Sequence, residues 1–359
     1  MNMLLSLTHS RKMPFASLAH QLRISNMLYT TSSEATKRDM TCTSETVQQV
    51  HDWKTRLLQH SLHDVDEITA SNQQLLKMTI DPTSLSCDRA AAVKKLSNPE
   101  FSSALKSLPP IGASIHPGTH FTLFPIRTPE PLLALDGYDT DWSPPSPFLQ
   151  RMWAGGVIEW HAKNPLTIGQ TARQTTRMAD AQLKPTGRGN AVFVTIQKNI
   201  SNDIGPAITE HRSYVYLENK PEITSDAVNA KRAIKKSLTA DFQTTVLPST
   251  ISLFRFSAIT FNSHLIHYDH IYASKKEGYP VCLVHGPMTC TLLLDLFQRN
   301  ANGKQIRKFS YRAISAVLVG KPLTLNGKWA TDSAGKPYCE LWATNDQGGM
   351  AMKGTVEFD

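Results

Sequence analysis

Residues 284–297 read VHGPMTCTLLLDLF, and this stretch decides the fold. Pro287 suits the first turn of a helix, because the backbone N–H that proline lacks would have no helical partner there. From Met288 to Phe297, apolar side chains would lie on almost every side of that helix, which predicts a helix buried all round. Strand-like runs surround it at 251–261, 306–319 and 338–343. We therefore expect an antiparallel sheet wrapped around one buried helix.

The preceding part of the chain has a similar layout but a weaker helix. A helical pattern covers 44–79, and a second short helix is expected over 88–96. Strand-like runs follow at 120–124, 157–160, 191–197 and 212–217. The candidate for a central helix here is the short, proline-rich stretch 144–152. The prediction is an α+β double hotdog, in which two antiparallel sheets each wrap a central helix and the first helix is short or incomplete.

The length of 359 residues suits two domains that each bury a core. We place an N-terminal hotdog domain with leading helices at 41–220, a polar, lysine-rich linker at 221–250 and a C-terminal hotdog domain at 251–359. Residues 1–40 are expected to be a mitochondrial transit peptide and tail, because 1–33 contain three basic residues and no acid. The predicted location is the mitochondrial matrix; the alternative is a tail of chance composition.

Composition excludes several other classes of protein. The net charge is +8, yet no Lys/Arg stripe alternates with aromatic residues and no nucleic-acid motif is present, so no nucleic-acid partner is expected. The five cysteines are odd in number and include no C-x-x-C pair, which fits a reducing compartment without disulfides. No apolar run approaches the roughly 18 residues that would predict membrane insertion.

Two segments could carry proton chemistry. Residues 261–269 read FNSHLIHYD, and His285-Gly286 begins the predicted buried helix. A histidine of near-neutral pKa can act as base and then as acid. The N-terminus of a helix offers unpaired N–H groups to a developing oxyanion, and glycine lets a substrate carbonyl approach closely. We therefore expect His267 to relay the proton, Gly286 to supply the backbone N–H and His285 to brace the loop before the helix.

The spacing of His264, His267 and His270 leaves other readings open. Histidines three residues apart are often ordinary loop residues, and they can also ligate zinc. No acidic or cysteine partner pattern accompanies them in the sequence, so no metal is predicted. The chemistry proposed below requires no redox cofactor either.

Longer motifs carry a family resemblance. Residues 253–269 and 277–287 resemble the MaoC-like hotdog hydratases, and so do Asp136-Gly137 and the segment RMWAGG at 151–156. The most similar branch contains the fungal mitochondrial 3-hydroxyacyl-thioester dehydratases type 2 and the bacterial mesaconyl-C4-CoA and itaconyl-CoA hydratases. The resemblance spans roughly residues 45 to 355. It implies a double hotdog that acts on acyl thioesters of coenzyme A or acyl carrier protein.

The resemblance also assigns residues. The signature Asp-x-Asn-Pro-x-His of the broader group ends on His267 and begins on Asn262. Asn262 can orient a water or hydroxyl but cannot exchange a proton at neutral pH, so His267 is expected to serve as a single base. The alternative is that Asp269 or a residue of the first half supplies a second acid/base group. Further residues expected to bind substrate are Arg255, Tyr268, Asp269, Tyr279 and His285.

Two of these expectations keep a structural alternative. Arg255 either faces a phosphate of the thioester carrier or pairs with a surface acid. Gly155-Gly156 is expected to form a tight turn with Trp153 packed in the core; the functional alternative is that the first half provides a groove for the acyl chain.

The predicted function is reversible dehydration of 3-hydroxyacyl thioesters to trans-2-enoyl thioesters, on acyl carrier protein in mitochondrial fatty-acid synthesis. One alternative is hydration of a short branched dicarboxylyl-CoA, such as mesaconyl-C4-CoA or itaconyl-CoA. Another is a non-catalytic acyl-thioester-binding subunit or a thioesterase on the same fold, since fold alone does not determine function. A double hotdog within one chain predicts a monomer or homodimer.

Overall fold

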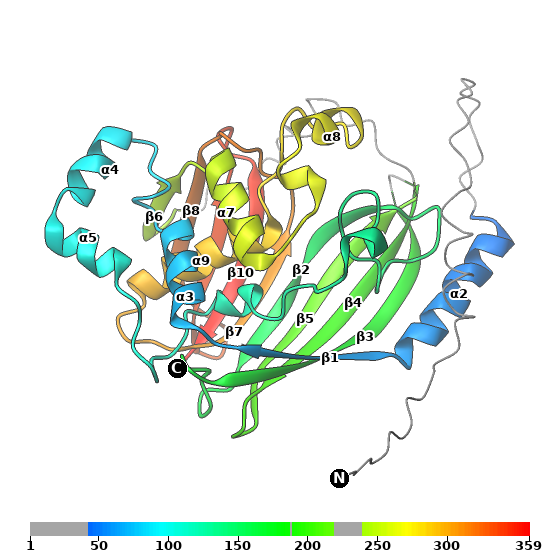
Figure 1. Cartoon of the computed structure of the whole chain (residues 1–359), viewed down its shortest axis with the longest axis horizontal. Coiled ribbons are helices and arrows are strands. Elements are labelled where there is room, and N and C mark those ends of the chain that lie inside the picture. Colours follow the sequence, from blue (N-terminus) through cyan, green and yellow to red (C-terminus); the bar gives the residue numbers. More distant parts are fainter. Residues whose placement is uncertain (1–41, 187–188, 219–238) are drawn as a thin grey trace, which may run out of the picture. The chain divides into compact units, whose positions relative to one another are not determined.

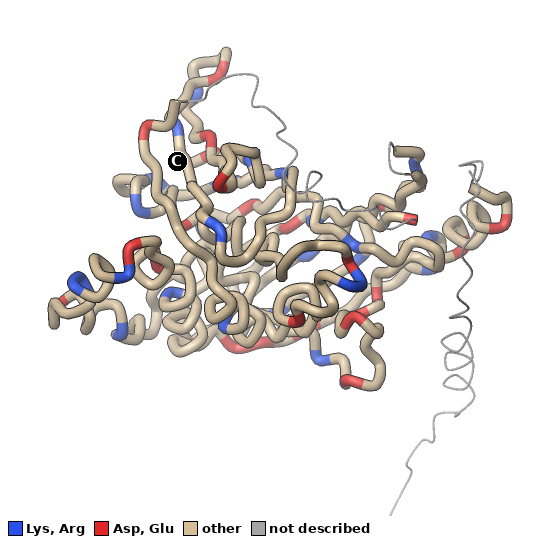
Figure 2. The backbone as a smooth tube through the Cα atoms, turned by 90° about the horizontal axis from the view of Figure 1, so that it is seen from above, with Lys and Arg blue, Asp and Glu red and all other residues tan. Residues whose placement is uncertain are grey.

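The computed structural model describes residues 42–186, 189–218 and 239–359 of the chain. The predicted transit peptide at 1–40 and residues 221–238 of the predicted linker lie outside the described residues. No helix of the described part is long and apolar enough to cross a membrane. Lys and Arg are interspersed with Asp and Glu along the described backbone (Figure 2).

One antiparallel sheet contains all the named strands. Their order across the sheet is β1-β3-β4-β5-β2-β7-β10-β9-β8-β6 (Figure 1). The strands are β1 (Ser61–Glu67), β2 (Gln150–Trp160), β3 (Thr171–Thr186), β4 (Gly189–Ser201), β5 (Pro206–Leu217), β6 (Phe242–Val246), β7 (Ile306–Ala313), β8 (Leu323–Thr331), β9 (Pro337–Thr344) and β10 (Met350–Phe358).

The strand order contains an internal repeat that the residues do not display. From the outer edge inward, the first half has the order β1-β3-β4-β5-β2 and the second half has the order β6-β8-β9-β10-β7. In each half this is the first, third, fourth, fifth and second strand along the chain. The halves meet where β2 pairs with β7. Glycines sit at this junction, with Gly155 opposite Arg312 and Gly156 opposite Tyr311. Two five-stranded units with the same connectivity, joined edge to edge, make the fold a double hotdog.

The second half has the predicted buried helix. Helix α9 (Gly286–Asn300) packs against β6, β8 and β9. Its side chains are buried all round, including Leu292, Leu293 and Phe297, none of which has exposed surface. Burying a side chain of this size contributes about 1.5–3 kcal/mol, so this apolar helix anchors the second core. The prediction for 288–297 is confirmed.

The first half has no such helix among the described residues. Between helix α5 (Pro99–Lys106) and β2 the chain forms only two short 3-10 turns, η1 (Thr119–Thr122) and η2 (Glu130–Leu132). Helix α2 (Ser44–Leu58) instead lies against β3 and packs Val50, Trp53 and Leu57 into the first core (Figure 1). The fold is thus the predicted double hotdog with an incomplete first helix. The stretch 144–152, the candidate for that helix, is not helical: 144–149 form a loop and β2 begins at Gln150.

Several short elements complete the chain. Helix α3 (Ala70–Ile80) follows β1, and helix α7 (Thr250–Thr260) follows β6, so the repeat extends to these two helices. Helix α4 (Arg89–Leu96) confirms the helix expected over 88–96. The turn η3 (Leu265–His267) and helix α8 (His270–Lys275) lie between α7 and α9. Of the predicted linker, the part from residue 242 onward forms β6 and the start of α7.

Four local predictions are wrong. The helical pattern at 44–79 is interrupted by β1, and the strand expected at 120–124 is the turn η1. The strand expected at 306–319 ends at Ala313, after which the chain leaves the sheet. Gly155-Gly156 is not a turn: it lies inside β2, where a bulge shifts the register between Trp153 and Gly155.

The strand expected at 251–261 is also wrong, because this segment is α7. Ser249 and Ser252 form a capping box that satisfies the first backbone N–H groups of the helix. Leu253, Phe256 and Ser257 are buried on one side, which is helical and not strand spacing.

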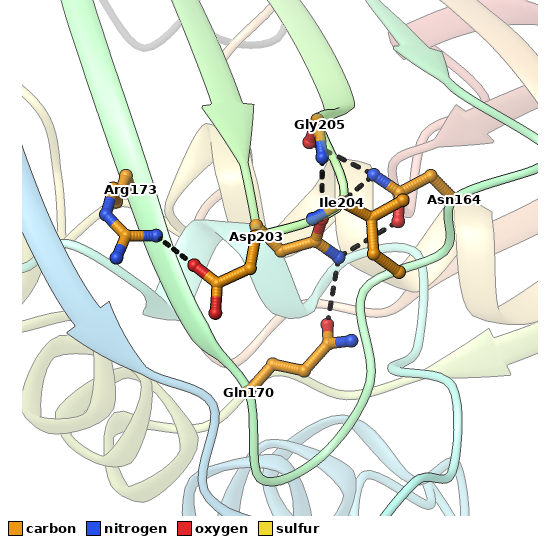
Figure 3. A network of polar contacts seen from close by, with 7 residues as sticks. Asn164, Gln170, Arg173, Asp203, Ile204 and Gly205 are labelled. Atoms are coloured by element: carbon orange, nitrogen blue, oxygen red, sulfur yellow. Dashed lines mark hydrogen bonds and ion pairs between the residues drawn. The ribbon is translucent and has the colours of Figure 1, made fainter.

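A polar network fixes the far end of the first half. In the turn between β4 and β5, Asn202 exchanges hydrogen bonds with Asn164 at 2.9 and 3.0 Å and donates to Gln170 at 3.2 Å (Figure 3). Arg173 pairs with Asp203 at 2.7 Å beside it, and both side chains are exposed. These contacts hold the loop between β2 and β3 to the next hairpin.

Candidate active site

The ring of His267 is oriented by a hydrogen bond to the backbone. The residue ends η3, and its Nδ1 lies 2.9 Å from the carbonyl oxygen of Leu283. A carbonyl can only accept, so Nδ1 carries the hydrogen and the neutral ring presents an unprotonated Nε2. The Leu283 residue itself is placed by a hydrogen bond from its N–H to the Ile266 carbonyl. The tautomer required of a base is therefore set by the backbone.

Burial holds the pKa of His267 well below its ordinary value, and the neighbouring His285 and His264 lower it further. The hydrogen bond to the Leu283 carbonyl acts in the opposite direction and is outweighed. The ring is consequently neutral at physiological pH and ready to accept a proton.

His285 lies directly against His267. The two rings stack with their centroids 3.6 Å apart and an interplanar angle of 19°. His285 is fully buried at the N-cap of α9, and its Nε2 lies 2.9 Å from the hydroxyl of Ser257 on α7. Burial, followed by the nearby His264, lowers the pKa of His285 to about 3. This arrangement fits the bracing role expected for His285.

Gly286 is the first residue of α9, immediately after the stacked histidine. The first N–H groups of a helix have no helical acceptor, and the helix dipole is positive at this end. A side chain at this position would come within 2.9 Å of Cγ of Trp153, which belongs to β2 of the first half. Glycine is required by this close packing, and the helix terminus beside His267 is suited to an oxyanion.

A loop of the first half docks on the histidine segment. The Asp136 carboxylate lies 3.3 Å from Nε2 of His264, whose ring meets His267 edge-on at 5.6 Å. The Leu265 N–H donates to the Asp136 carbonyl at 2.8 Å. Burial alone would raise the pKa of Asp136, but the hydrogen bond and charge of His264, aided by Arg151, lower it overall. The histidines therefore do have an acidic partner, which the sequence pattern did not reveal.

This partner does not create a metal site. Within residues 42–186, 189–218 and 239–359, no group of three or more His, Cys, Asp or Glu side chains could hold a metal ion. His270, the third histidine of the spacing, is exposed at the start of α8. His264 and His267 thus belong to a histidine–carboxylate cluster that both halves of the chain build.

Arg151, from the motif 151–156, lies on the first-half side of this cluster. Its guanidinium stands 3.2 Å above the ring centre of Tyr138, and its charge contributes to lowering the pKa of both His264 and His267. Arginine in this place helps to keep the histidines unprotonated.

Asn262 and Asp269 have structural tasks in the same segment. The Asn262 side chain accepts a hydrogen bond from the His264 N–H at 3.0 Å and so shapes the turn that carries the histidines. The Asp269 carboxylate caps α8 by accepting from the Ile271 and Tyr272 N–H groups at 2.8 and 2.9 Å. A second acid/base group is therefore better sought in the first half, where the Asp136 carboxylate lies.

The other residues expected to bind substrate lie further from the stacked rings. Tyr268 is exposed and donates its hydroxyl to the Ser263 carbonyl at 3.1 Å. The Tyr279 N–H donates to the Ala273 carbonyl at 2.9 Å, which closes the loop after α8. Arg255 is exposed on α7 and makes no hydrogen bond or ion pair with a described residue.

Sequence analysis missed a second charged cluster. Glu210 and Arg212 point to the same side of β5 and are joined by two hydrogen bonds of 2.7 and 2.9 Å; Glu210 has no exposed surface. Opposite charges two residues apart in a strand share one face of a sheet, and that spacing is the signal in the sequence. Arg212 lies over the Trp153 ring, 4.6 Å from its centre, which connects the cluster to Gly286.

A double hotdog with a histidine beside the N-terminus of its buried helix is the arrangement expected of the MaoC-like class. The chain matches the family described as hydroxyacyl-thioester dehydratase type 2 over residues 118–319, a range that includes Asp136, His267 and Gly286. The chain belongs to this family.

Named relatives agree with that assignment. The mesaconyl-C(4)-CoA hydratase of Chloroflexus aurantiacus is 33% identical over 256 residues, which cover 69% of this chain and 87% of the relative. The mitochondrial hydroxyacyl-thioester dehydratase type 2 of Schizosaccharomyces pombe is 30% identical over 239 residues, which cover 59% of this chain and 77% of the relative. Both names describe hydro-lyase activity.

Solved structures support the fold. A MaoC-like dehydratase from Phytophthora capsici superposes with a TM-score of 0.56 at 13% identity and covers 87% of this chain and 98% of its own. HtdX of Mycobacterium tuberculosis superposes with a TM-score of 0.54 at 15% identity and covers 84% of this chain and all of its own.

Proposed function

We propose that the chain interconverts 3-hydroxyacyl and trans-2-enoyl thioesters, with His267 as the acid/base and the Gly286 N–H as the oxyanion donor. The observation that carries this proposal is the Nδ1 contact of His267 with the Leu283 carbonyl at 2.9 Å. It leaves Nε2 unprotonated, and the ring stacks on the residue that precedes Gly286.

Dehydration then needs one proton carrier. Nε2 of His267 removes the α-proton, and the Gly286 N–H and helix dipole stabilise the negative charge that develops on the thioester oxygen. The protonated Nε2 gives that proton to the departing β-hydroxyl, the C–O bond breaks, and water leaves as the C=C bond forms. Asn262 holds the turn that presents the histidines, and the Asp136 carboxylate with His264 is the alternative source of a second acid/base group.

Two substrates are candidates. The first is a 3-hydroxyacyl group on acyl carrier protein in mitochondrial fatty-acid synthesis. It is supported by the name of the Schizosaccharomyces pombe relative and by the acid-free segment 1–33, and its proposed location is the mitochondrial matrix. The second is a short branched dicarboxylyl-CoA, supported by the name of the Chloroflexus relative. The Glu210–Arg212 cluster favours the second candidate, because an arginine side chain can bind the second carboxylate of a dicarboxylyl group.

Hydration of 2-enoyl thioesters by the purified protein tests the reaction. The substrates are crotonyl-CoA, a longer 2-enoyl-CoA, mesaconyl-C4-CoA and a 2-enoyl acyl carrier protein, with the product identified by mass spectrometry. His267→Ala should lose about 100- to 10,000-fold in kcat, the usual contribution of a general acid/base. His270→Ala, a change at the exposed histidine three residues on, is the matched control and should keep full activity.

Three results contradict the proposal. Full activity of His267→Ala removes the residue from the mechanism. Release of free thiol without hydrated product would identify the protein as a thioesterase. Saturable binding of every enoyl thioester without turnover would identify the protein as a non-catalytic binding subunit.

A further inference from the structure

A buried ion pair lies on the inner face of the first half, where the central helix is missing. Arg212 donates through Nε and Nη2 to the two carboxylate oxygens of Glu210, and Nη1 makes no hydrogen bond with a described residue. The half-buried Lys198 stands directly opposite Glu210 in the sheet, and Nε2 of the buried His120 lies 3.8 Å from the same carboxylate. Glu210 therefore has several basic neighbours, and Arg212 keeps one N–H edge that no described residue occupies.

A tightly packed glycine lies between Arg212 and Tyr311 in the sheet. Gly156 on β2 is paired with Arg212 on one side and with Tyr311 of β7 on the other, so the three form one row across the junction of the halves. The middle member has no side chain, and a Cβ there would lie 3.1 Å from the Tyr311 hydroxyl. The guanidinium and the phenol thus face each other across a glycine.

Two buried donors in this region have no protein partner. The Tyr311 hydroxyl and the Trp153 indole N–H are inaccessible to solvent and make no hydrogen bond within the described structure. More than about 90% of buried polar groups are paired in folded proteins, so unpaired donors indicate a missing acceptor. Two unpaired donors beside a guanidinium match a carboxylate, which only accepts.

The cluster lies close to the proposed reaction centre. Trp153 contacts Gly286 with one part of its side chain and Arg212 with its ring face, so a single indole separates the oxyanion donor from the guanidinium. An acyl group whose thioester oxygen is bound at Gly286 can reach the cluster with only a few carbon atoms.

We propose that Arg212, the Tyr311 hydroxyl and the Trp153 indole N–H bind a second carboxylate of a short acyl group. This inference rests on the proposed hydro-lyase reaction and selects the dicarboxylyl thioester among its substrates. Glu210 is a positioning residue: it holds the guanidinium by two hydrogen bonds and leaves one edge for the substrate.

The test compares two substrates on one enzyme preparation. Mesaconyl-C4-CoA carries the second carboxylate and crotonyl-CoA does not, and the ratio of their kcat/KM values is independent of the folded fraction. Tyr311→Phe removes one oxygen atom and should lower this ratio about 10-fold. The double variant Glu210→Gln/Arg212→Gln removes both charges, so that neither is left unpaired, and should lower it about 100-fold.

Arg173→Gln is the control, because Arg173 forms an exposed ion pair with Asp203; the ratio should not change (Figure 3). The inference is overturned if wild-type protein hydrates crotonyl-CoA better than mesaconyl-C4-CoA, or if Tyr311→Phe leaves the ratio unaltered. Absence of hydration with every enoyl thioester is a different result, since it rejects the hydro-lyase reaction itself. Tyr311→Phe decides the question if the double variant does not fold.

Discussion

The imidazole rings of His267 and His285 lie nearly parallel, with their centroids 3.6 Å apart, and only His267 has a backbone acceptor for its ring N–H. Two protonated rings at this distance would repel each other strongly in a buried site. The stack therefore stabilises the form in which both rings are neutral, and it couples the protonation of the catalytic candidate to that of the residue before Gly286.

The first prediction concerns the pH dependence of the reaction. Because burial and His285 hold the pKa of His267 well below its ordinary value of 6.5, the base stays unprotonated in mildly acidic solution. The acid limb of kcat/KM for enoyl-CoA hydration should lie below pH 6.5. Rates measured from pH 5 to pH 8 in buffers of constant ionic strength check this, and a half-maximal rate at or above pH 6.5 contradicts it.

The second prediction concerns stability. The pKa of His285 is about 3 in the folded protein and near 6.5 when the chain is unfolded, so the unfolded state binds more protons between these values. The free energy of unfolding should be unaffected by His285 above pH 6.5. It should fall by up to about 1.4 kcal/mol per pH unit as the pH drops toward 3.

Urea unfolding between pH 7.5 and pH 4.5 measures this slope. His285→Gln keeps a hydrogen-bonding side chain near Ser257 and removes the titrating ring, so its slope should be shallower than that of the wild type. Identical slopes for the two proteins would show that His285 does not titrate on unfolding.

The third prediction concerns the close packing of Gly286. In Gly286→Ala the added methyl group meets Trp153 at 2.9 Å, so either the indole or the helix terminus must move. Overpacking of this kind costs about 1–3 kcal/mol. Thermal unfolding should show the loss, and kcat should fall together with it because the oxyanion donor is displaced.

Trp153→Leu in the Gly286→Ala background supplies the control, since a smaller side chain relieves the clash. Stability should partly return in the double variant. If Gly286→Ala alone unfolds and turns over like the wild type, glycine is not required at this position.

The sequence predicted the elements whose signals are local. Helix α9 is apolar on almost every side and has Pro287 in its first turn, so its burial and its N-terminus could be predicted from fourteen residues. His267 and Gly286 were predicted as partners because each carries a recognisable chemistry. Helix α7 was predicted as a strand because residues 251–261 are rich in Ile and Phe, and its helical form depends on the Ser249 cap and on packing.

Contacts between the halves could not be predicted in the same way. Asp136 meets His264, and Trp153 covers Gly286, only because β2 pairs with β7 and brings the two hotdogs together. The residue pattern of a segment in one half does not indicate which segment of the other half it will contact. Arg212 was missed for the same reason, since a charged residue in a strand usually faces solvent, and its burial follows from Gly156 and Trp153 on the neighbouring strand.

The last prediction concerns the carboxylate that the first half contributes. Asp136→Asn keeps a polar side chain near His264 but removes the charge, which lies 3.3 Å from the histidine Nε2. Because the folded-state pKa of Asp136 is lowered, its ionised form adds stability above its unfolded pKa of about 3.8, and that stability is lost as the pH falls through the folded value. The variant should therefore be less stable than the wild type at pH 7, and the difference should shrink as the pH falls below 3.8.

The effect of Asp136→Asn on turnover distinguishes the two mechanisms. If His267 is the single acid/base, kcat should fall less than about 10-fold, because the charge acts only through His264. If the Asp136 carboxylate with His264 supplies a second acid/base group, the loss should reach about 100-fold or more, within the range of general acid–base catalysis. Asp203→Asn, in the exposed pair with Arg173, is the control for removing a carboxylate and should leave kcat unchanged.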